Sequence, residues 1–352
     1  MIIEETKICT INDESIFKIV LENNNNLRVS IITYGGTISE ILLPDKESGF
    51  QNIVLSLEHI EDYKNNSLYL GANLGPNAGR IRNGEIIIDG KKYFVSKNEG
   101  KHNLHGGYKP VSFLNWEIDK IEKNNTNACV TLKTYLEDGL DGFPGRRQIT
   151  ATYTLDDSDR LTIDYKAISN KDTYFNLSNH SYFNLSGDFT KSGLNQYLYI
   201  DADKYIQTDE ENIPIRFSSV DNSPFDFRFL KNMEEQICKY PNDLQIISSK
   251  GYNHGFDIHE AAEKGKPVLK LWDAKRTKGL KMYTDAPCVV IYSGGFIGDK
   301  YTLKGGVKSS DSCAIALEAQ DYPDVFHLCK DNVCITRKNE IYKRKISYEF
   351  LY

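Results

Sequence analysis

The chain has 352 residues, of which 40% are hydrophobic and 26% are charged, and its formal net charge is -6. This composition excludes a membrane-embedded protein and a wholly disordered chain, and the lack of a basic cluster argues against nucleic acid as a partner. The first ten residues include acidic side chains, and no run of about 18 apolar residues follows. We therefore expect a cytoplasmic protein that does not bind membranes.

Alternating apolar and polar residues predict β-strands along most of the chain. The clearest pattern is a hairpin of residues 149–155 and 161–167, joined by the turn-forming sequence D-D-S-D. Further strands are expected at residues 27–32, 38–43, 130–135, 198–200, 268–272, 288–292 and 346–351.

Helical periodicity is scarce and is visible only at residues 56–63 and 230–240. Many short strands with few helices indicate an all-β fold, either a sandwich or a barrel. At about 150 residues per domain the length alone would suggest two domains. Because no linker or change in composition is visible, we instead predict one domain over residues 1–352.

Residues 173–188 are unusually polar for a strand. If this segment is extended, one face carries only Asn176, Ser178, His180, Tyr182 and Asn184. A solvated outer face is the alternative interpretation, but such faces usually carry Lys and Glu, which are missing here. A mixture of hydrogen-bond donors and acceptors suits a polyhydroxylated ligand.

Residues 311–322 place Glu318 and Gln320 on one strand face together with Ala314 and Ala316. The two alanines leave room above the sheet, and a Glu in such an apolar stretch is costly to bury without a partner. Glu318 is therefore either paired structurally with an Arg or is a carboxylate that faces a cavity.

Two glycine-bearing segments add candidate residues. His105 precedes Gly106 and Gly107, and Arg80 follows Gly79 in a loop. Neither segment has the spacing of a phosphate-binding loop. No His-x-His or His-Glu-x-x-His spacing is present, so we expect neither a metal nor a cofactor.

Together these segments resemble the aldose 1-epimerase, or galactose mutarotase, family, collinearly over nearly the whole chain. The most specific motifs are N-L-S-N-H-S-Y-F-N-L at 176–185 and L-E-A-Q-D-Y-P-D at 317–324, and Y-S-G-G-F at 292–296 also matches. The resemblance implies one large antiparallel β-sandwich, related to the supersandwich fold, with a shallow sugar site. The implied ligand is a free aldohexose such as glucose or galactose, bound by a monomer or homodimer.

The resemblance also implies residue roles. Glu318 would be the base that removes the C1 hydroxyl proton, and His180 would be the acid that protonates the ring oxygen, which opens the ring. Modest stabilisation of the imidazolium would keep His180 protonated near neutral pH. The implied binding residues, which would contact the sugar or line its site, are Arg80, His105, Tyr182 and Gln320.

Three positions depart from the pattern of that family. Asn253 stands where an Asp usually binds sugar hydroxyls, Gly79 stands where an Asn usually precedes the Arg, and an Arg common near Pro76 is replaced. A carboxylate accepts two hydrogen bonds, whereas an amide both accepts and donates. All three changes concern sugar binding and not the implied acid–base pair, so we hypothesise that the reaction is kept while affinity or hydroxyl preference has shifted.

Three other functions remain open from the sequence. A non-catalytic sugar-binding or sensing module could share the fold. A hexose-6-phosphate 1-epimerase would need further Arg or Lys residues to bind the phosphate, and the matched motifs contain only Arg80. A glycoside hydrolase would need two carboxylates, and only Glu318 fits a site position well.

Overall fold

The structure is a computed structural model that describes residues 1–46, 48–330 and 333–352. Strands account for 46% of the chain and helices for 11%. All pairings between neighbouring strands of its sheets are antiparallel in the described residues. The all-β prediction is confirmed.

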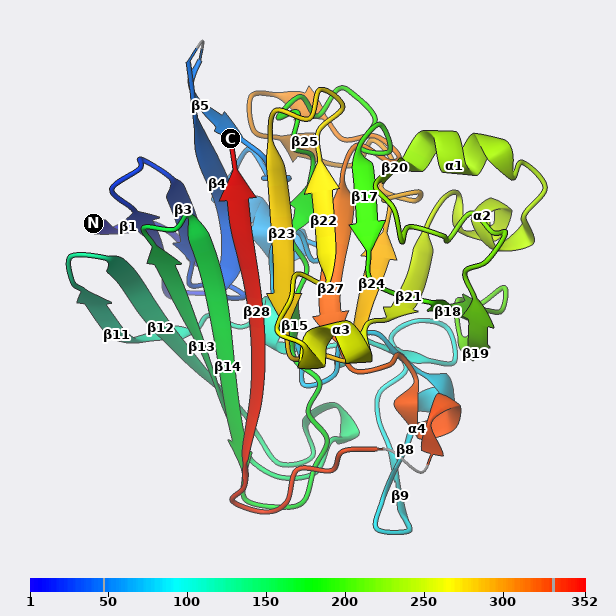
Figure 1. Cartoon of the computed structure of the whole chain (residues 1–352). Helices are drawn as coiled ribbons and strands as arrows, with labels where there is room; N and C mark the ends of the chain where they lie inside the picture. The colour runs from blue at the N-terminus through cyan, green and yellow to red at the C-terminus, as the bar shows by residue number, and fades with distance from the viewer. Residues whose placement is uncertain (47, 331–332) are drawn as a thin grey trace.

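Three large sheets form the body of the molecule (Figure 1). The first has the order β11 (Glu117–Lys123), β12 (Asn127–Leu136), β13 (Arg147–Asp156), β14 (Arg160–Ser169), β28 (Ile341–Leu351), β23 (Gly279–Thr284), β22 (Leu269–Trp272), β17 (Tyr197–Ile200) and β20 (Lys231–Asn232). The second has the order β16 (Tyr182–Phe183), β27 (Ile315–Gln320), β24 (Cys288–Tyr292), β21 (Asn253–Asp257), β18 (Lys204–Thr208) and β19 (Pro214–Ser219). The third has the order β1 (Ile2–Ile11), β2 (Glu14–Glu22), β3 (Arg28–Ile32), β4 (Thr37–Asp45) and β5 (Gly49–Asn52).

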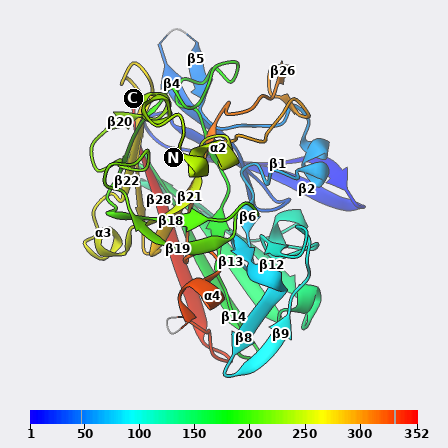
Figure 2. The ribbon, with the colours of Figure 1, turned by 90° about the vertical axis from the view of Figure 1, so that its right-hand side faces the viewer.

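Short elements connect these sheets (Figure 2). The two-stranded pairs are β6 (Asn73–Leu74) with β15 (Ser178–Asn179), β7 (Arg80–Ile81) with β10 (Asn103–Leu104), β8 (Glu85–Ile88) with β9 (Lys91–Phe94), and β25 (Thr302–Leu303) with β26 (Val307–Lys308). The α-helices are α1 (Met233–Lys239), α2 (Leu244–Ser249), α3 (His259–Glu263) and α4 (Val325–Leu328). The 3₁₀ turns are η1 (Ile60–Asn65), η2 (Arg82–Gly84), η3 (Val111–Phe113) and η4 (Leu140–Gly142).

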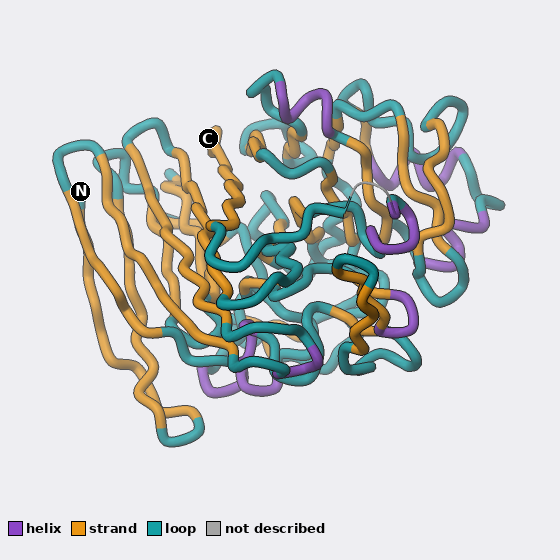
Figure 3. The backbone as a smooth tube through the Cα atoms, turned by 90° about the horizontal axis from the view of Figure 1, so that it is seen from below, coloured by secondary structure: helices purple, strands orange, loops and turns teal. Residues whose placement is uncertain are grey.

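The main core lies between two layers (Figures 1 and 3). The nine-stranded sheet forms one layer, and the five-stranded and six-stranded sheets form the other. The predicted hairpin consists of β13 and β14, and its apolar residues alternate with polar ones because one face of each strand packs into the core. Ile149 and Ile163 are fully buried in the core, whereas the intervening threonines are only partly buried. Burying one face of each strand removes apolar surface from water and fixes the register.

Two buried tyrosines connect the nine-stranded sheet to the segment that carries His180. The Asn73 amide donates to Tyr153 Oη at 2.7 Å, and Tyr165 Oη donates to Asn73 Oδ1 at 2.7 Å. Tyr165 Oη also lies 3.0 Å from the carbonyl oxygen of Ser178. The phenol groups therefore satisfy polar atoms that the core would otherwise leave without partners.

The predicted strands all occur, but one of the two predicted helices does not. Residues 230–240 contain α1, as expected. Residues 56–63 do not form a regular helix, because Val54 and Leu57 make β-bridges to Phe183 and Leu303 and keep the chain extended. Only the 3₁₀ turn η1 follows, beginning at Ile60.

Residues 173–188 are not one continuous strand, so the expected polar face does not form. Only β15 and β16 are regular, and the irregular residues 173–177 before them and 184–185 after them are buried. Asn176 Nδ2 donates to the Ala78 carbonyl, and Asn184 Nδ2 donates to the Cys313 carbonyl. These polar side chains replace missing ladder hydrogen bonds in a buried, irregular segment instead of facing a ligand.

In the part of the chain that the structure describes, no helix is long and apolar enough to cross a membrane.

Candidate active site

The candidate site lies on the face of the six-stranded sheet that points away from the main core. Alternation along β27 buries Leu317 in that core and turns Glu318 to the opposite face. The ladder places Glu318 opposite Val290 of β24, and Val290 opposite Gly255 of β21. The alanines that were expected to leave room, Ala314 and Ala316, lie in a separate small core cluster on this side.

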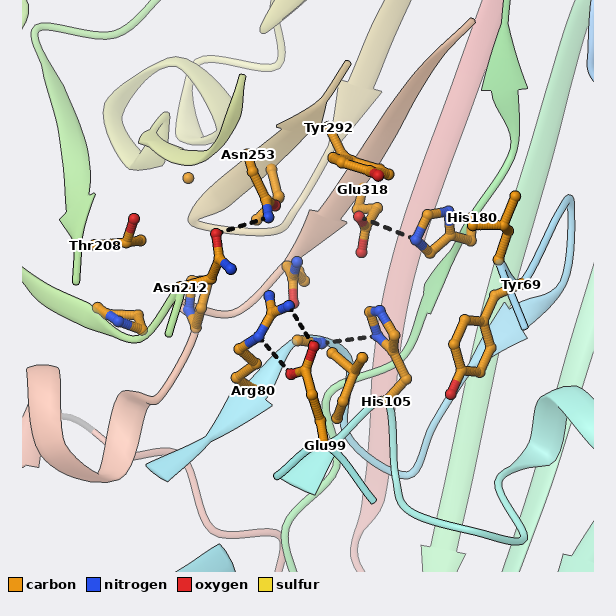
Figure 4. Close-up of a pocket in the computed structure, with 18 of the residues that line it drawn as sticks. Tyr69, Arg80, Glu99, His105, His180, Thr208, Asn212, Asn253, Tyr292 and Glu318 are labelled. Carbon is orange, nitrogen blue, oxygen red and sulfur yellow. Dashed lines mark hydrogen bonds and ion pairs between the residues drawn. The ribbon is translucent and has the colours of Figure 1, made fainter. Parts of the chain in front are cut away.

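A pocket of about 420 Å³ opens on this face, within the usual size range for a small-molecule site (Figure 4). All eight site residues predicted from the sequence line it: Gly79, Arg80, His105, His180, Tyr182, Asn253, Glu318 and Gln320. Other residues that line the pocket were not expected from the sequence, among them Tyr69, Glu99, Asn212, Tyr292 and Phe296. Tyr292 and Phe296 lie in a motif that the resemblance highlighted, but loop residues such as Glu99 and Asn212 carried no periodic or motif signal.

His180 and Glu318 face each other inside the pocket. Nε2 of His180 lies 3.4 Å from Oε1 of Glu318, and the two side chains are only 5% and 4% exposed. Nδ1 of His180 and Oε2 of Glu318 are buried without a partner among the described residues. Unpartnered buried polar atoms are rare in folded proteins and mark a place where a polar ligand fits.

Burial shifts both ionisations toward the neutral forms. Loss of hydration raises the pKa of Glu318 to about 8, an effect that the Arg80 charge partly opposes. Loss of hydration lowers the pKa of His180 to about 3. Burial therefore favours a neutral His180 near neutral pH, contrary to the expectation that it stays protonated. When the pair holds a single proton in the free pocket, burial places that proton on Glu318.

Aromatic rings fix the His180 imidazole. Tyr182 stacks on it with ring centroids 4.8 Å apart and an interplanar angle of 25°, and Tyr69 lies roughly parallel to it at 6.2 Å. The Tyr182 hydroxyl donates to the carbonyl of Leu68 at 3.2 Å. Tyr182 thus lines the pocket as predicted, and its hydroxyl is engaged by the main chain.

The His105 ring is held in one tautomer by the main chain. Its Nδ1 accepts a hydrogen bond from the Gly79 N–H at 3.1 Å, so the neutral ring carries its proton on Nε2. Burial, His180 and Arg80 all lower the pKa of His105, which keeps the ring neutral. His105 is therefore a neutral donor beside His180, with ring centroids 5.3 Å apart.

Arg80 is engaged by Glu99, which the sequence did not predict. Nε and Nη2 of Arg80 donate to the two carboxylate oxygens of Glu99 at 2.6 and 2.8 Å, so the two side chains form a bidentate pair. Arg80 lines the pocket, but part of its guanidinium already has a partner. One edge of the guanidinium is used by Glu99, and the remaining N–H groups are the ones that a ligand can reach.

Gly79 packs closely against Gln320. Its φ of +74° is unfavourable for most residues, and a Cβ added there would lie 2.9 Å from Gln320 Oε1. That Gln320 oxygen is buried without a partner among the described residues. Glycine at this position therefore leaves space for the Gln320 amide beside the other residues that line the pocket.

Asn253 is paired with Asn212 at the end of the pocket opposite His180 (Figure 4). The Asn253 amide nitrogen donates to Oδ1 of Asn212 at 3.1 Å. Asn212 lies in the turn between β18 and β19, with a φ of 58°.

The side chains of His105, His180 and Glu318 are also close enough to be considered as metal ligands, with donor atoms within 4.8 Å of one another. The His105 tautomer opposes this. Its Nδ1 faces the Gly79 N–H, so a metal on Nε2 would displace the proton that this hydrogen bond places there. The residues therefore fit a metal poorly, and they fit proton transfer to and from a bound ligand better.

Comparison with known proteins gives a consistent result. The aldose 1-epimerase family model matches residues 18–349. The chain is 30% identical to an aldose 1-epimerase of Escherichia coli over 95% of this chain and 94% of the relative, and 30% identical to a galactose mutarotase of Rattus norvegicus over 93% and 92%. A crystal structure of a galactose 1-epimerase from Lactobacillus acidophilus superposes with a TM-score of 0.87 at 27% identity, covering 99% of this chain and 98% of that one.

Proposed function

The chain belongs to the aldose 1-epimerase family, and from that premise we propose that its pocket interconverts the α- and β-anomers of free aldohexoses through Glu318 and His180. The protein is an isomerase of this family. The buried His180–Glu318 pair carries the proposal, because one proton donor and one proton acceptor, 3.4 Å apart, are what ring opening of a hemiacetal requires.

The reaction proceeds by paired proton transfers. The base takes the proton from the C1 hydroxyl while the acid donates a proton to the ring oxygen, so the bond between C1 and the ring oxygen breaks and an open-chain aldehyde forms. Rotation about the C1–C2 bond presents the other face of the aldehyde, and the two transfers then run in reverse. The number of protons on the pair is the same before and after a turnover.

Glu318 acts as the base and His180 as the acid in this proposal. In the free pocket burial favours the proton on Glu318, so the charged arrangement must be stabilised when sugar hydroxyls and the ring oxygen contact the pair. The positive charge of Arg80 already favours the Glu318 carboxylate. The Nε2–H of His105 supplies a neutral donor for charge that develops at the ring oxygen.

The remaining lining residues bind and position the sugar. Gln320 lies next to Glu318 on the same strand face and offers an unpartnered oxygen. Asn253 lies on β21, two strands from β27. The free N–H groups of Arg80 reach hydroxyls between these two positions, and Gly79 keeps space for the Gln320 amide.

A phosphorylated substrate is less well supported. Arg80 is the only Lys or Arg among the described residues that line the pocket, and Glu99 already neutralises it. A phosphate would need additional positive charge. Glu99 is also the second pocket carboxylate that a glycoside hydrolase would require, but both of its oxygens are bound to Arg80.

We further propose that the chain acts as one domain, since the main core cluster contains residues from Ile19 to Phe350. A cytoplasmic location and a monomeric or homodimeric state are part of the same proposal.

Polarimetry tests the proposed function. Freshly dissolved α-D-glucose or α-D-galactose should reach its equilibrium rotation faster with the protein than with buffer alone, and glucose 6-phosphate should not be preferred. A rate equal to the buffer control, together with measurable sugar binding, would instead identify a non-catalytic sugar-binding module.

A further inference from the structure

The pocket has a second polar centre away from the reacting pair, and nothing in the proposed proton transfers uses it. Asn212 and Asn253 both line the pocket and are hydrogen-bonded to each other at 3.1 Å. Asn253 lies two strands from Glu318, which corresponds to about 10 Å across the sheet. A sugar whose C1 contacts Glu318 therefore meets this pair with a different part of its ring.

The pairing determines what the two amides offer. The contact uses Nδ2 of Asn253 and Oδ1 of Asn212, which leaves the side-chain oxygen Oδ1 of Asn253 and the side-chain nitrogen Nδ2 of Asn212 for a ligand. Whichever amide donates within the pair, one acceptor and one donor remain. A single sugar hydroxyl can donate to the remaining acceptor and accept from the remaining donor. A carboxylate in place of either amide would only accept hydrogen bonds from hydroxyl groups.

The turn that carries Asn212 is shaped by its own hydrogen bonds and is joined by an exposed ion pair to the segment before His105. The Asp209 carboxylate accepts from the N–H groups of Glu211 and Ile213 at 3.0 and 2.9 Å, which shapes the turn. Glu211 pairs with Lys101 at 2.7 Å, in the segment just before His105. Asn212 is therefore held in position before a ligand binds, and such preorganisation lowers the cost of binding.

We propose that Asn212 is a sugar-binding and specificity-determining residue, and that with Asn253 it binds one hydroxyl on the part of the ring remote from C1. This rests on the proposed function for the identity of the ligand as a sugar. Asn212 determines specificity because only a hydroxyl directed at the pair can use the acceptor and the donor together. A sugar without that hydroxyl leaves both amides unpaired.

Sugar binding measured by calorimetry tests the inference without requiring turnover. Asn212→Gly removes the amide while glycine accepts the positive φ of the turn, and Asn222→Gly is the matched control, since Asn222 is exposed and has a φ of 53°. Each protein is titrated with D-galactose and with its 2-, 3-, 4- and 6-deoxy derivatives. Asn212→Asp adds a variant of the same shape that accepts but no longer donates.

The expected result is a roughly 3- to 10-fold weaker binding of galactose by Asn212→Gly and Asn212→Asp, the effect of one ordinary hydrogen bond, with no change in Asn222→Gly. One deoxy derivative should bind the wild type and Asn212→Gly equally well. The inference is overturned if the wild type and Asn212→Gly bind galactose with equal affinity. It is also overturned if Asn212→Gly loses the same affinity, relative to the wild type, for every deoxy derivative. If these binding results hold while the wild type shows no mutarotation, only the proposed reaction fails.

Discussion

His180 Nε2 and Glu318 Oε1 lie 3.4 Å apart in a pocket wall where both side chains are almost completely buried. Burial makes charge costly on each of them, so the pair holds one proton over a wide pH range instead of ionising fully. In the proposed mechanism this relationship determines the proton transfers and the pH dependence, and it should also affect the stability of the protein.

Removing either member of the pair should abolish most of the activity while sugar binding survives. We expect His180→Asn and Glu318→Gln each to reduce kcat by about 10²- to 10⁴-fold in polarimetric assays, because each loses one proton transfer. The exposed pair His259 and Glu263 has the same 3.4 Å separation, so His259→Asn and Glu263→Gln are matched controls that should keep full activity. Near-normal kcat in either pocket variant would remove that residue from the mechanism.

The pH profile should have an alkaline limb. Glu318 has a pKa of about 8 in the free protein, and His180 has one of about 3, so a single proton is present between these values. Above pH 8 the pair loses this proton, and kcat/KM should fall about tenfold per pH unit. The measurement is kcat/KM from about pH 3.5 to 10, corrected for the uncatalysed rate. A profile that stays flat to pH 10, or that rises through pH 4–5, would contradict the burial effect on Glu318.

The same burial should make Glu318 a destabilising residue. The folded carboxyl has a pKa of about 8 against an ordinary value of 4.5, so the unfolded state releases the proton more readily. Raising the pH from 4.5 to 8 therefore favours unfolding, and below 4.5 this cost is absent. Glu318→Gln should increase the free energy of unfolding by on the order of 2–3 kcal/mol at pH 7.

Urea denaturation at pH 5 and pH 7 checks this expectation. Glu318→Gln should increase the free energy of unfolding more at pH 7 than at pH 5, and the surface variant Glu263→Gln should change it little at either pH. A destabilised Glu318→Gln at pH 7 would mean that the carboxylate is stabilised by the folded protein.

Gly79 should be needed for the position of Gln320 and not only for backbone conformation. Gly79→Ala introduces a Cβ 2.9 Å from Gln320 Oε1, so we expect a several-fold higher KM in addition to a loss of stability. Gly90 has a φ of +77° and open space around it, so Gly90→Ala carries similar backbone strain without the contact. Comparing KM in the two variants isolates the Gln320 contact, and an equal KM in both would show that the contact is unimportant.

The strands could be predicted from local alternation, and the eight expected residues, which line one pocket, could be found from motifs of the family that the chain resembles. In β27, for example, a period of two was enough to separate Leu317 from Glu318. Residues 173–188 were misinterpreted because polar side chains in an irregular buried segment follow the same alternation as a solvent-facing strand. There, Asn176 and Asn184 satisfy main-chain groups that only the folded structure reveals.

The partners of the site residues could not be predicted for a different reason. Glu99 is 19 positions from Arg80, and Asn212 is 41 positions from Asn253, with irregular segments between them. Such pairs depend on how distant loops meet, and neither has a characteristic spacing. The ionisation of His180 was also misjudged, because its pKa depends on complete burial, which the sequence around it does not show.

The hydrogen bond from the Gly79 N–H to His105 has a consequence for how the site can vary. The donor belongs to the main chain, so it depends on no side chain of this loop and stays in place as long as the backbone at Gly79 keeps its conformation. The other side chains of this pocket loop can therefore vary while the proton on the His105 ring stays on the same nitrogen.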